Sequence, residues 1–132
     1  MKKILIADDE PEILKLIRRA LELEDENYEL HEAKNGDEAL AKAIEIKPDL
    51  LLLDIMMPGM SGYEVCRELK NNPDTKGIII IFVTARGASD IAESTMKMRG
   101  GDGFIPKPFS MDVLAFKIKQ ILKQHEQGKE LF

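Results

Sequence analysis

The sequence predicts an α/β fold in which a parallel sheet lies between layers of helices. Short apolar runs alternate with amphipathic segments five times along the chain, which is typical of repeated strand–helix units. Several of the runs are continuously apolar, as expected for strands that are buried on both faces of a parallel sheet. The chain has 132 residues. That length corresponds to one domain with a core of its own.

The first part of the chain is expected to form two strand–helix pairs. Residues 3–7, KILIA, form an apolar run that is short enough to be a strand. Residues 10–24 carry apolar side chains at helical spacing, which predicts an amphipathic helix. Residues 28–33 alternate in polarity and predict a second strand, and residues 35–47 predict a second helix. This helix opens on Asn35 in a pattern that resembles a capping box.

The middle of the chain repeats the pattern. Residues 49–54, DLLLLD, predict a buried strand, and residues 61–72 predict a helix that opens on Ser61 with a glutamate three residues later. Residues 77–85, GIIIIFVTA, are too rich in β-branched side chains for a short helix and predict a strand. Residues 89–98 form a weaker amphipathic pattern, which we assign to a helix.

The last strand–helix pair closes the predicted domain. Residues 103–107 predict a short strand, and residues 110–124 predict a final helix that ends near Lys123. The inward side chains of this helix are expected to be Leu114, Ile118, Ile121 and Leu122. We therefore expect a domain over residues 1–124 and a short tail over residues 125–132.

Composition excludes several classes of function. The net charge of −5 argues against nonspecific binding to nucleic acid or to a membrane surface, since both require a basic face. Cys66 is the single cysteine, so an internal disulfide is impossible and a reducing cytoplasm suits the chain. The apolar run near the N-terminus is too short for a signal peptide or a membrane span. We expect a cytoplasmic protein without direct contact to nucleic acid or membrane.

Polar residues follow the apolar strands at the points where the strands end. Asp8 and Asp9 follow the first strand, Asp54 ends the third, Thr84 lies at the end of the fourth and Lys107 at the end of the fifth. The carboxyl ends of parallel strands meet at one edge of the sheet, where ligands bind in such folds. We therefore expect these side chains to converge on one site.

The grouped residue types favour phosphoryl chemistry with a divalent cation. Clustered carboxylates repel one another unless a cation lies between them, and Mg²⁺ prefers oxygen ligands of this kind. A lysine and a hydroxyl group suit the negative oxygens of a phosphoryl group. Asp54 is the natural nucleophile, because an aspartate carboxylate can carry a covalent phosphoryl group.

Four motifs in the same order carry a family resemblance. The segments ADDE, LLLDIMMPGMSG, VTA and KPF are spaced as in the receiver domain of bacterial response regulators, and the chain resembles that family over residues 3–123. The resemblance implies a doubly wound, flavodoxin-like fold with a five-stranded parallel sheet in the order 2-1-3-4-5 and five helices. It also implies a signalling switch of a two-component system.

The resemblance assigns the phosphorylation and metal sites residue by residue. Asp54 would accept the phosphoryl group from a sensor histidine kinase or a phosphotransfer protein. Asp9 would bind Mg²⁺ directly and Asp8 through water, with Asp54 and the backbone carbonyl of Met56 as the other protein ligands. The chain would then catalyse only its own phosphotransfer and a slow autodephosphorylation.

The resemblance also assigns the residues that report the phosphorylated state. Thr84 and Lys107 would contact the phosphoryl group, and Phe104 would be the aromatic side chain that turns inward on activation. The Lys107–Pro108 peptide bond would be cis. The face built from the fourth helix, fifth strand and fifth helix would change shape for a downstream protein that the sequence does not name.

Two other functions share part of this pattern. A haloacid-dehalogenase-like phosphatase also forms an aspartyl phosphate, but it needs a second aspartate where Met56 stands and a cap for which the chain has no room. A flavodoxin-like cofactor binder needs a Ser/Thr/Gly-rich phosphate loop after the first strand, where this chain has the acidic ADDEPE. Labelling by acetyl phosphate with Mg²⁺, against flavin colour or phosphate-ester turnover, distinguishes the three functions.

Overall fold

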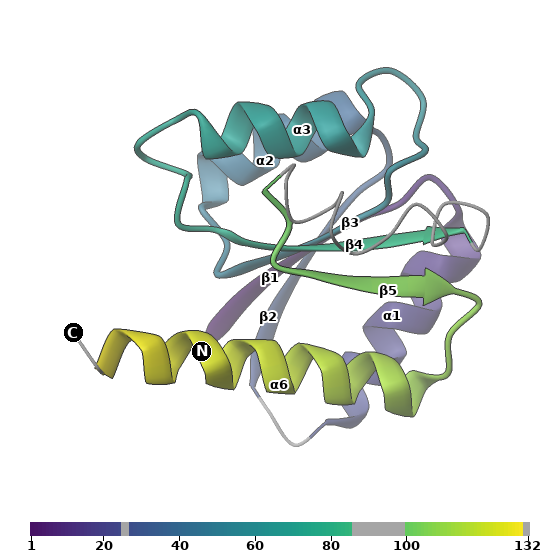
Figure 1. The fold of residues 1–132 in the computed structure, drawn as a ribbon. Helices are drawn as coiled ribbons and strands as arrows, with labels where there is room; N and C mark the ends of the chain where they lie inside the picture. The colour runs from purple at the N-terminus through teal and green to yellow at the C-terminus, as the bar shows by residue number, and fades with distance from the viewer. Residues whose placement is uncertain (25–26, 86–99, 131–132) are drawn as a thin grey trace.

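The computed structural model describes residues 1–24, 27–85 and 100–130. Five strands form a single parallel sheet in the order β2-β1-β3-β4-β5 (Figure 1). The strands are β1 Lys2–Ala7, β2 Tyr28–Ala33, β3 Leu50–Leu53, β4 Ile79–Ala85 and β5 Gly103–Lys107. The predicted parallel sheet and its strand order are confirmed.

Helices cover both faces of the sheet. They are α1 Pro11–Leu23, α2 Gly36–Ile46, α3 Gly62–Lys70 and α6 Met111–Glu130. In Figure 1, α2 and α3 lie on one side of the sheet, and α1 and α6 lie on the other. The described residues thus contain four of the five expected helices, and the helix predicted over residues 89–98 lies outside them.

The strand β3 explains the run of four leucines. It pairs with β1 on one side and β4 on the other, so it lies in the middle of the sheet. Leu50 and Leu52 enter the core beneath α1 and α6, while Leu51 and Leu53 enter the core beneath α2 and α3. Because successive side chains of a strand point to opposite faces, a central strand needs apolar residues at every position.

Two helices begin on the capping residues that the sequence predicts. The Asn35 side chain accepts a hydrogen bond from the Glu38 backbone N–H at 2.8 Å, and the Ser61 hydroxyl oxygen accepts one from Glu64 at 3.2 Å. These bonds satisfy backbone donors that have no partner within a first helical turn. The caps therefore fix where α2 and α3 start after their preceding strands.

The last helix is longer than the sequence analysis expected. Its inward residues are buried as predicted, namely Leu114, Ile118, Ile121 and Leu122. The expected end near Lys123 is wrong, because α6 continues to Glu130. The added residues contain no proline, and their single glycine costs a helix only about 1 kcal/mol relative to alanine. None of the helices in the described ranges is both long and apolar enough to cross a membrane.

Candidate functional site

The sheet brings the predicted polar residues to one rim. Ala7 at the end of β1 pairs in register with Leu53 at the end of β3, so the residues that follow them lie side by side. The backbone N–H of Asp54 donates to the Ala7 carbonyl at 3.0 Å, which continues this pairing. Asp8 and Asp54 therefore leave the core together, at the carboxyl ends of neighbouring strands.

Lys107 joins the two aspartates. Its ammonium Nζ lies 2.7 Å from Asp8 Oδ2 and 3.2 Å from Asp54 Oδ2. Its side chain is only 12% exposed, so the two ion pairs are largely shielded from water. A third carboxylate, that of Glu10, lies 3.4 Å from the same nitrogen and is exposed. One cation at the end of β5 thus pairs with acidic groups that follow β1 and β3, and the cluster keeps a net negative charge.

Burial changes the proton affinity of these groups. Asp8 and Asp54 are 1% and 4% exposed. Burial raises the pKa of both carboxyls above the ordinary value, and the neighbouring Asp8 charge raises the pKa of Asp54 further. Burial alone would lower the pKa of Lys107, but its hydrogen bond to Asp8 and the charges of both carboxylates outweigh burial and raise it.

Backbone donors hold both carboxylates in place. The Met56 N–H donates to Asp54 Oδ1 at 3.2 Å, and the Glu10 N–H donates to Asp8 Oδ1 at 2.9 Å. Each aspartate therefore uses one oxygen for a backbone donor and turns the other toward Lys107. The arrangement fixes the direction in which the carboxylate of Asp54 faces.

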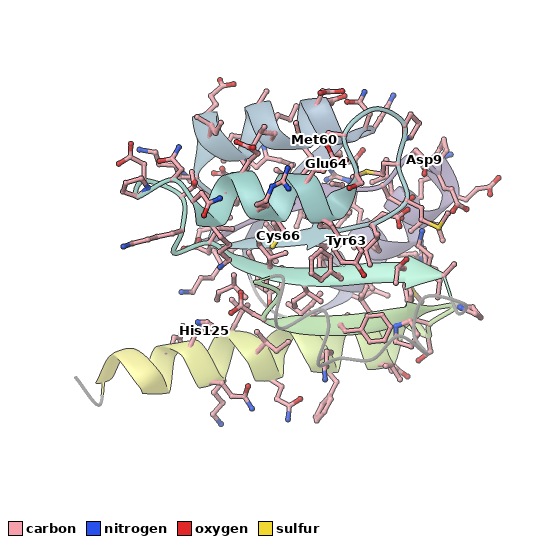
Figure 2. The ribbon with its side chains drawn as sticks, turned by 45° about the horizontal axis from the view of Figure 1, so that its top comes forward. Asp9, Met60, Tyr63, Glu64, Cys66 and His125 are labelled. Atoms are coloured by element: carbon pink, nitrogen blue, oxygen red, sulfur yellow. The ribbon has the colours of Figure 1, made fainter. Side chains whose placement is uncertain are left out.

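The acidic residues of the rim could hold a cation. Asp8, Asp9, Glu10 and Asp54 each offer a carboxylate oxygen, and these oxygens lie within 4.8 Å of one another. Figure 2 shows Asp9, which is exposed, at the end of the molecule toward which the β4 arrow points. Hard divalent cations such as Mg²⁺ take oxygen ligands and retain waters, so a partly exposed set of carboxylates fits Mg²⁺. The backbone carbonyl of Met56 as a further ligand stays a prediction.

Thr84 adds a polar group that the protein leaves unpaired. It is fully buried, and its hydroxyl oxygen has no hydrogen-bond partner within the described part of the chain. A buried hydroxyl group without a partner is costly, which favours a role in contacting a ligand. Phe104 pairs in register with Phe82 and packs, partly buried, against the core beneath α2 and α3. The contact of Thr84 with a phosphoryl group and the inward turn of Phe104 stay predictions.

Two residues of the site were missed by the sequence analysis. Glu10 reaches Lys107, although the pair is separated by 97 positions in the chain. Gly62 at the start of α3 packs against the Asp54 loop, because a Cβ on Gly62 would lie 2.3 Å from the Asp54 carbonyl oxygen. The sequence feature that could have pointed to Gly62 is its position directly after the capping Ser61, where α3 begins.

Two further expectations from the sequence concern the ends of strands. The Lys107–Pro108 peptide bond is cis in the structure. Arg86 follows Thr84 by two positions in the sequence, as Met56 follows Asp54, and Arg86 lies outside the described residues. Met56 is 70% exposed at the rim, so a water that approaches Asp54 in line with the phosphorus would pass close to it.

Comparisons with known proteins show what the whole chain is similar to. A family model described as the response regulator receiver domain matches residues 4–119. The transcriptional regulatory protein ResD of Bacillus subtilis is 44% identical over 126 residues, which are 95% of this chain and 50% of ResD. The phosphate regulon transcriptional regulatory protein PhoB of Pseudomonas aeruginosa is 42% identical over 127 residues, covering 96% of this chain and 54% of PhoB.

A solved structure shows the same fold over nearly the whole chain. A CheY-like response regulator receiver domain protein from Methanospirillum hungatei superposes with a TM-score of 0.84 at 32% sequence identity. The match covers 97% of this chain and 98% of that protein. The doubly wound, flavodoxin-like fold class is confirmed, and neither the phosphatase nor the cofactor-binding alternative is supported.

The relatives also bear on two of the expectations from the sequence. The chain spans about half the length of the curated relatives it matches. Both relatives are named transcriptional regulatory proteins, so the expected absence of nucleic-acid contact receives no support from them. The domain boundary after residue 124 stays a prediction, and it falls within α6.

Proposed function

Because this chain belongs to the response regulator receiver domain family, we propose that it is phosphorylated on Asp54 by a sensor histidine kinase or a phosphotransfer protein. The observation that carries the proposal is the buried Asp54 carboxylate, held 3.2 Å from Lys107 in a rim of acidic residues. In the transfer, a P–O bond forms at Asp54 as the P–N bond of the donor phosphohistidine breaks. The cytoplasm is the compartment in which we place this reaction.

Asp9 and Asp54 are proposed as direct Mg²⁺ ligands, with Asp8 acting through water and the Met56 carbonyl completing the protein ligands. The four clustered carboxylates support this assignment, because without a cation they would repel an incoming phosphoryl group. When bound, Mg²⁺ would supply positive charge to the oxygens of the transferred group. The exposed Asp9 would leave one side of the ion open to water and donor.

Lys107 and Thr84 are proposed to hold the phosphoryl group after transfer. A phosphoryl group carries a charge of about −1.5 to −2, which replaces the single negative charge of the Asp54 carboxylate. The nearby ammonium of Lys107 therefore gains a stronger partner. The unpaired hydroxyl of Thr84 would donate to a phosphoryl oxygen and so gain the bond it lacks. Movement of Thr84 would open space toward which Phe104 turns.

These movements would reach β5 and α6, and the helix that the sequence predicts over residues 89–98. Lys107 is the last residue of β5, and α6 begins at Met111 shortly after it. A two-state change of this face, driven by a local charge, would control binding of a downstream protein. The chain would catalyse no reaction besides its own phosphotransfer and slow dephosphorylation.

The test is labelling with acetyl phosphate and Mg²⁺, followed by intact-mass measurement. The wild-type chain is expected to gain one phosphoryl group, and Asp54→Asn is expected to gain none. Asp49→Asn is the matched control, because Asp49 lies at the other end of β3 and its carboxylate accepts a hydrogen bond from the Lys3 backbone N–H. This variant should be labelled like wild type. A full phosphoryl mass on Asp54→Asn, or labelling unaffected by removal of Mg²⁺, would contradict the assignment.

A further inference from the structure

A hollow lies at the amino ends of β1 and β2, at the opposite end of the strands from Asp54. It has a volume of about 290 Å³ and is lined by Lys2, Tyr28, Lys119, Leu122, Lys123 and Glu126. Lys2 begins β1 and Tyr28 begins β2, while Asp8 follows the carboxyl end of β1. A six-residue strand is about 20 Å long, so the hollow is well separated from the proposed phosphorylation site. Figure 1 shows the start of β1 beside the C-terminal half of α6.

The rim of the hollow is positively charged. Three lysines and one glutamate line it, although the whole chain has a net charge of −5. Lys2 Nζ lies 3.3 Å from Glu126 Oε1, and this pair is exposed to solvent. Lys123 is exposed and has no ion pair or hydrogen bond within the described part of the chain. Lys119 Nζ lies 3.9 Å from Glu24 Oε2 in an exposed pair. The charge of Lys123 therefore remains available to an anion at this rim, and Lys2 and Lys119 lie beside it in solvent-exposed pairs.

The floor of the hollow is apolar. Leu122 is 7% exposed, and Tyr28 is partly buried against the core beneath α1 and α6. The hydrocarbon stems of Lys119 and Lys123 add to this surface, since long cationic side chains lay their stems on apolar atoms and keep their heads in water. An apolar floor under a cationic rim suits a ligand with a flat apolar part and a negative group.

The size of the hollow restricts the ligand further. Sites for small molecules begin at about 300 Å³, so the hollow suits one small molecule and is too small for a folded partner. We propose that this hollow binds an organic phosphate of mononucleotide size, with its ring against Tyr28 and Leu122 and its phosphate near Lys2, Lys119 and Lys123. Such a ligand would give the chain a second input that is chemically independent of Asp54.

The test is a titration of the ¹⁵N-labelled chain with adenosine monophosphate at low salt, followed by NMR. Saturable shifts are expected at Lys2, Tyr28 and the C-terminal half of α6. The Lys119→Gln/Lys123→Gln double variant is expected to raise Kd at least about tenfold, which corresponds to about 1.4 kcal/mol. Lys76→Gln, which removes an exposed lysine elsewhere on the surface, is the matched control and should bind like wild type.

Adenosine and inorganic phosphate, titrated separately, test the two halves of the proposed ligand. Each is expected to bind more weakly than the monophosphate, since each lacks one of the two contacts. Absence of saturable shifts in the wild type, shifts confined to another surface, or equal affinity of the double variant and Lys76→Gln would overturn the proposal. Labelling of Asp54 by acetyl phosphate is expected to be unchanged in the double variant. Failure of Asp54 labelling in the wild type would refute the proposed phosphorylation and leave the nucleotide result standing by itself.

Discussion

Gly62 is the position where a single added carbon atom should disturb the site most directly. In Gly62→Ala, the new Cβ would lie 2.3 Å from the Asp54 carbonyl oxygen and 2.7 Å from the Ile55 Cα. Both are backbone atoms, so no side chain can turn away to make room. Restoring van der Waals contact requires α3 and the Asp54 loop to separate by about 1 Å.

The change in the free energy of unfolding of Gly62→Ala is the difference between two opposing effects. Overpacking of a close contact costs about 1–3 kcal/mol, while alanine in place of glycine favours a helix by at most about 1 kcal/mol. Gly62 has no positive φ, so backbone strain adds nothing to the cost. We expect a net loss of about 1–2 kcal/mol in the free energy of unfolding. For a chain of 132 residues this lowers Tm by about 4–7 °C.

Chemical denaturation of wild type, Gly62→Ala and Gly77→Ala measures this cost. Gly77 is the matched control, because a Cβ there would meet no heavy atom within 4 Å, and its unfolding free energy should stay within about 0.5 kcal/mol of wild type. The rate of acetyl phosphate labelling should also fall in Gly62→Ala, since Asp54 moves relative to Lys107. Equal stability of Gly62→Ala and Gly77→Ala would refute the reasoning from close contact.

Four further predictions concern the metal ligands, the path of water to Asp54 and the buried thiol. Asp9→Ala should weaken Mg²⁺ binding strongly and Asp8→Ala less so, as measured by metal titration, and an unchanged affinity in Asp9→Ala would exclude it as a ligand. The Met56→Asn/Arg86→Glu double variant should lose its phosphoryl group faster than wild type after donor removal, because both new side chains accept hydrogen bonds from water. A decay that is unchanged or slower would show that these two side chains do not restrict the attacking water. Burial raises the pKa of the Cys66 thiol from 9.0 to about 11, so at pH 8 native Cys66 should react with iodoacetamide at least about 100-fold more slowly than a free thiol. Because this pKa is raised in the folded state, Cys66 contributes stability that is present below pH 9.0 and is lost as the pH rises through about 11. Denaturation curves should therefore show a smaller fall in the unfolding free energy of Cys66→Ala than of wild type over this pH range.

The local patterns of the sequence predicted most of the fold because they report burial directly. The four leucines of β3 could only belong to a strand covered on both faces, and the caps at Asn35 and Ser61 marked helix starts that the structure confirms. The end of α6 failed because residues after Lys123 contain no strong stop signal, and a helix ends where such a signal or the loss of packing ends it.

The site was predicted by residue type and not by contact. The strand ends placed Asp8, Asp54 and Lys107 on one rim, but no local pattern shows that a single ammonium group lies between the two carboxylates. The contacts of Glu10 and Gly62 depend in the same way on how distant segments pack, which periodicity does not encode. Such contacts follow only once the register of the strands is known.

The position of Lys107 also has a mechanical consequence. The central strand β3 and the edge strand β5 are separated by β4, so their backbones lie about 10 Å apart. The ion pair of Lys107 with Asp54 passes over the end of β4 and ties the middle of the sheet to its edge. Any charge placed on Asp54 therefore acts as a pull on β5 through one side chain, and the intervening strand need not move for the edge to respond.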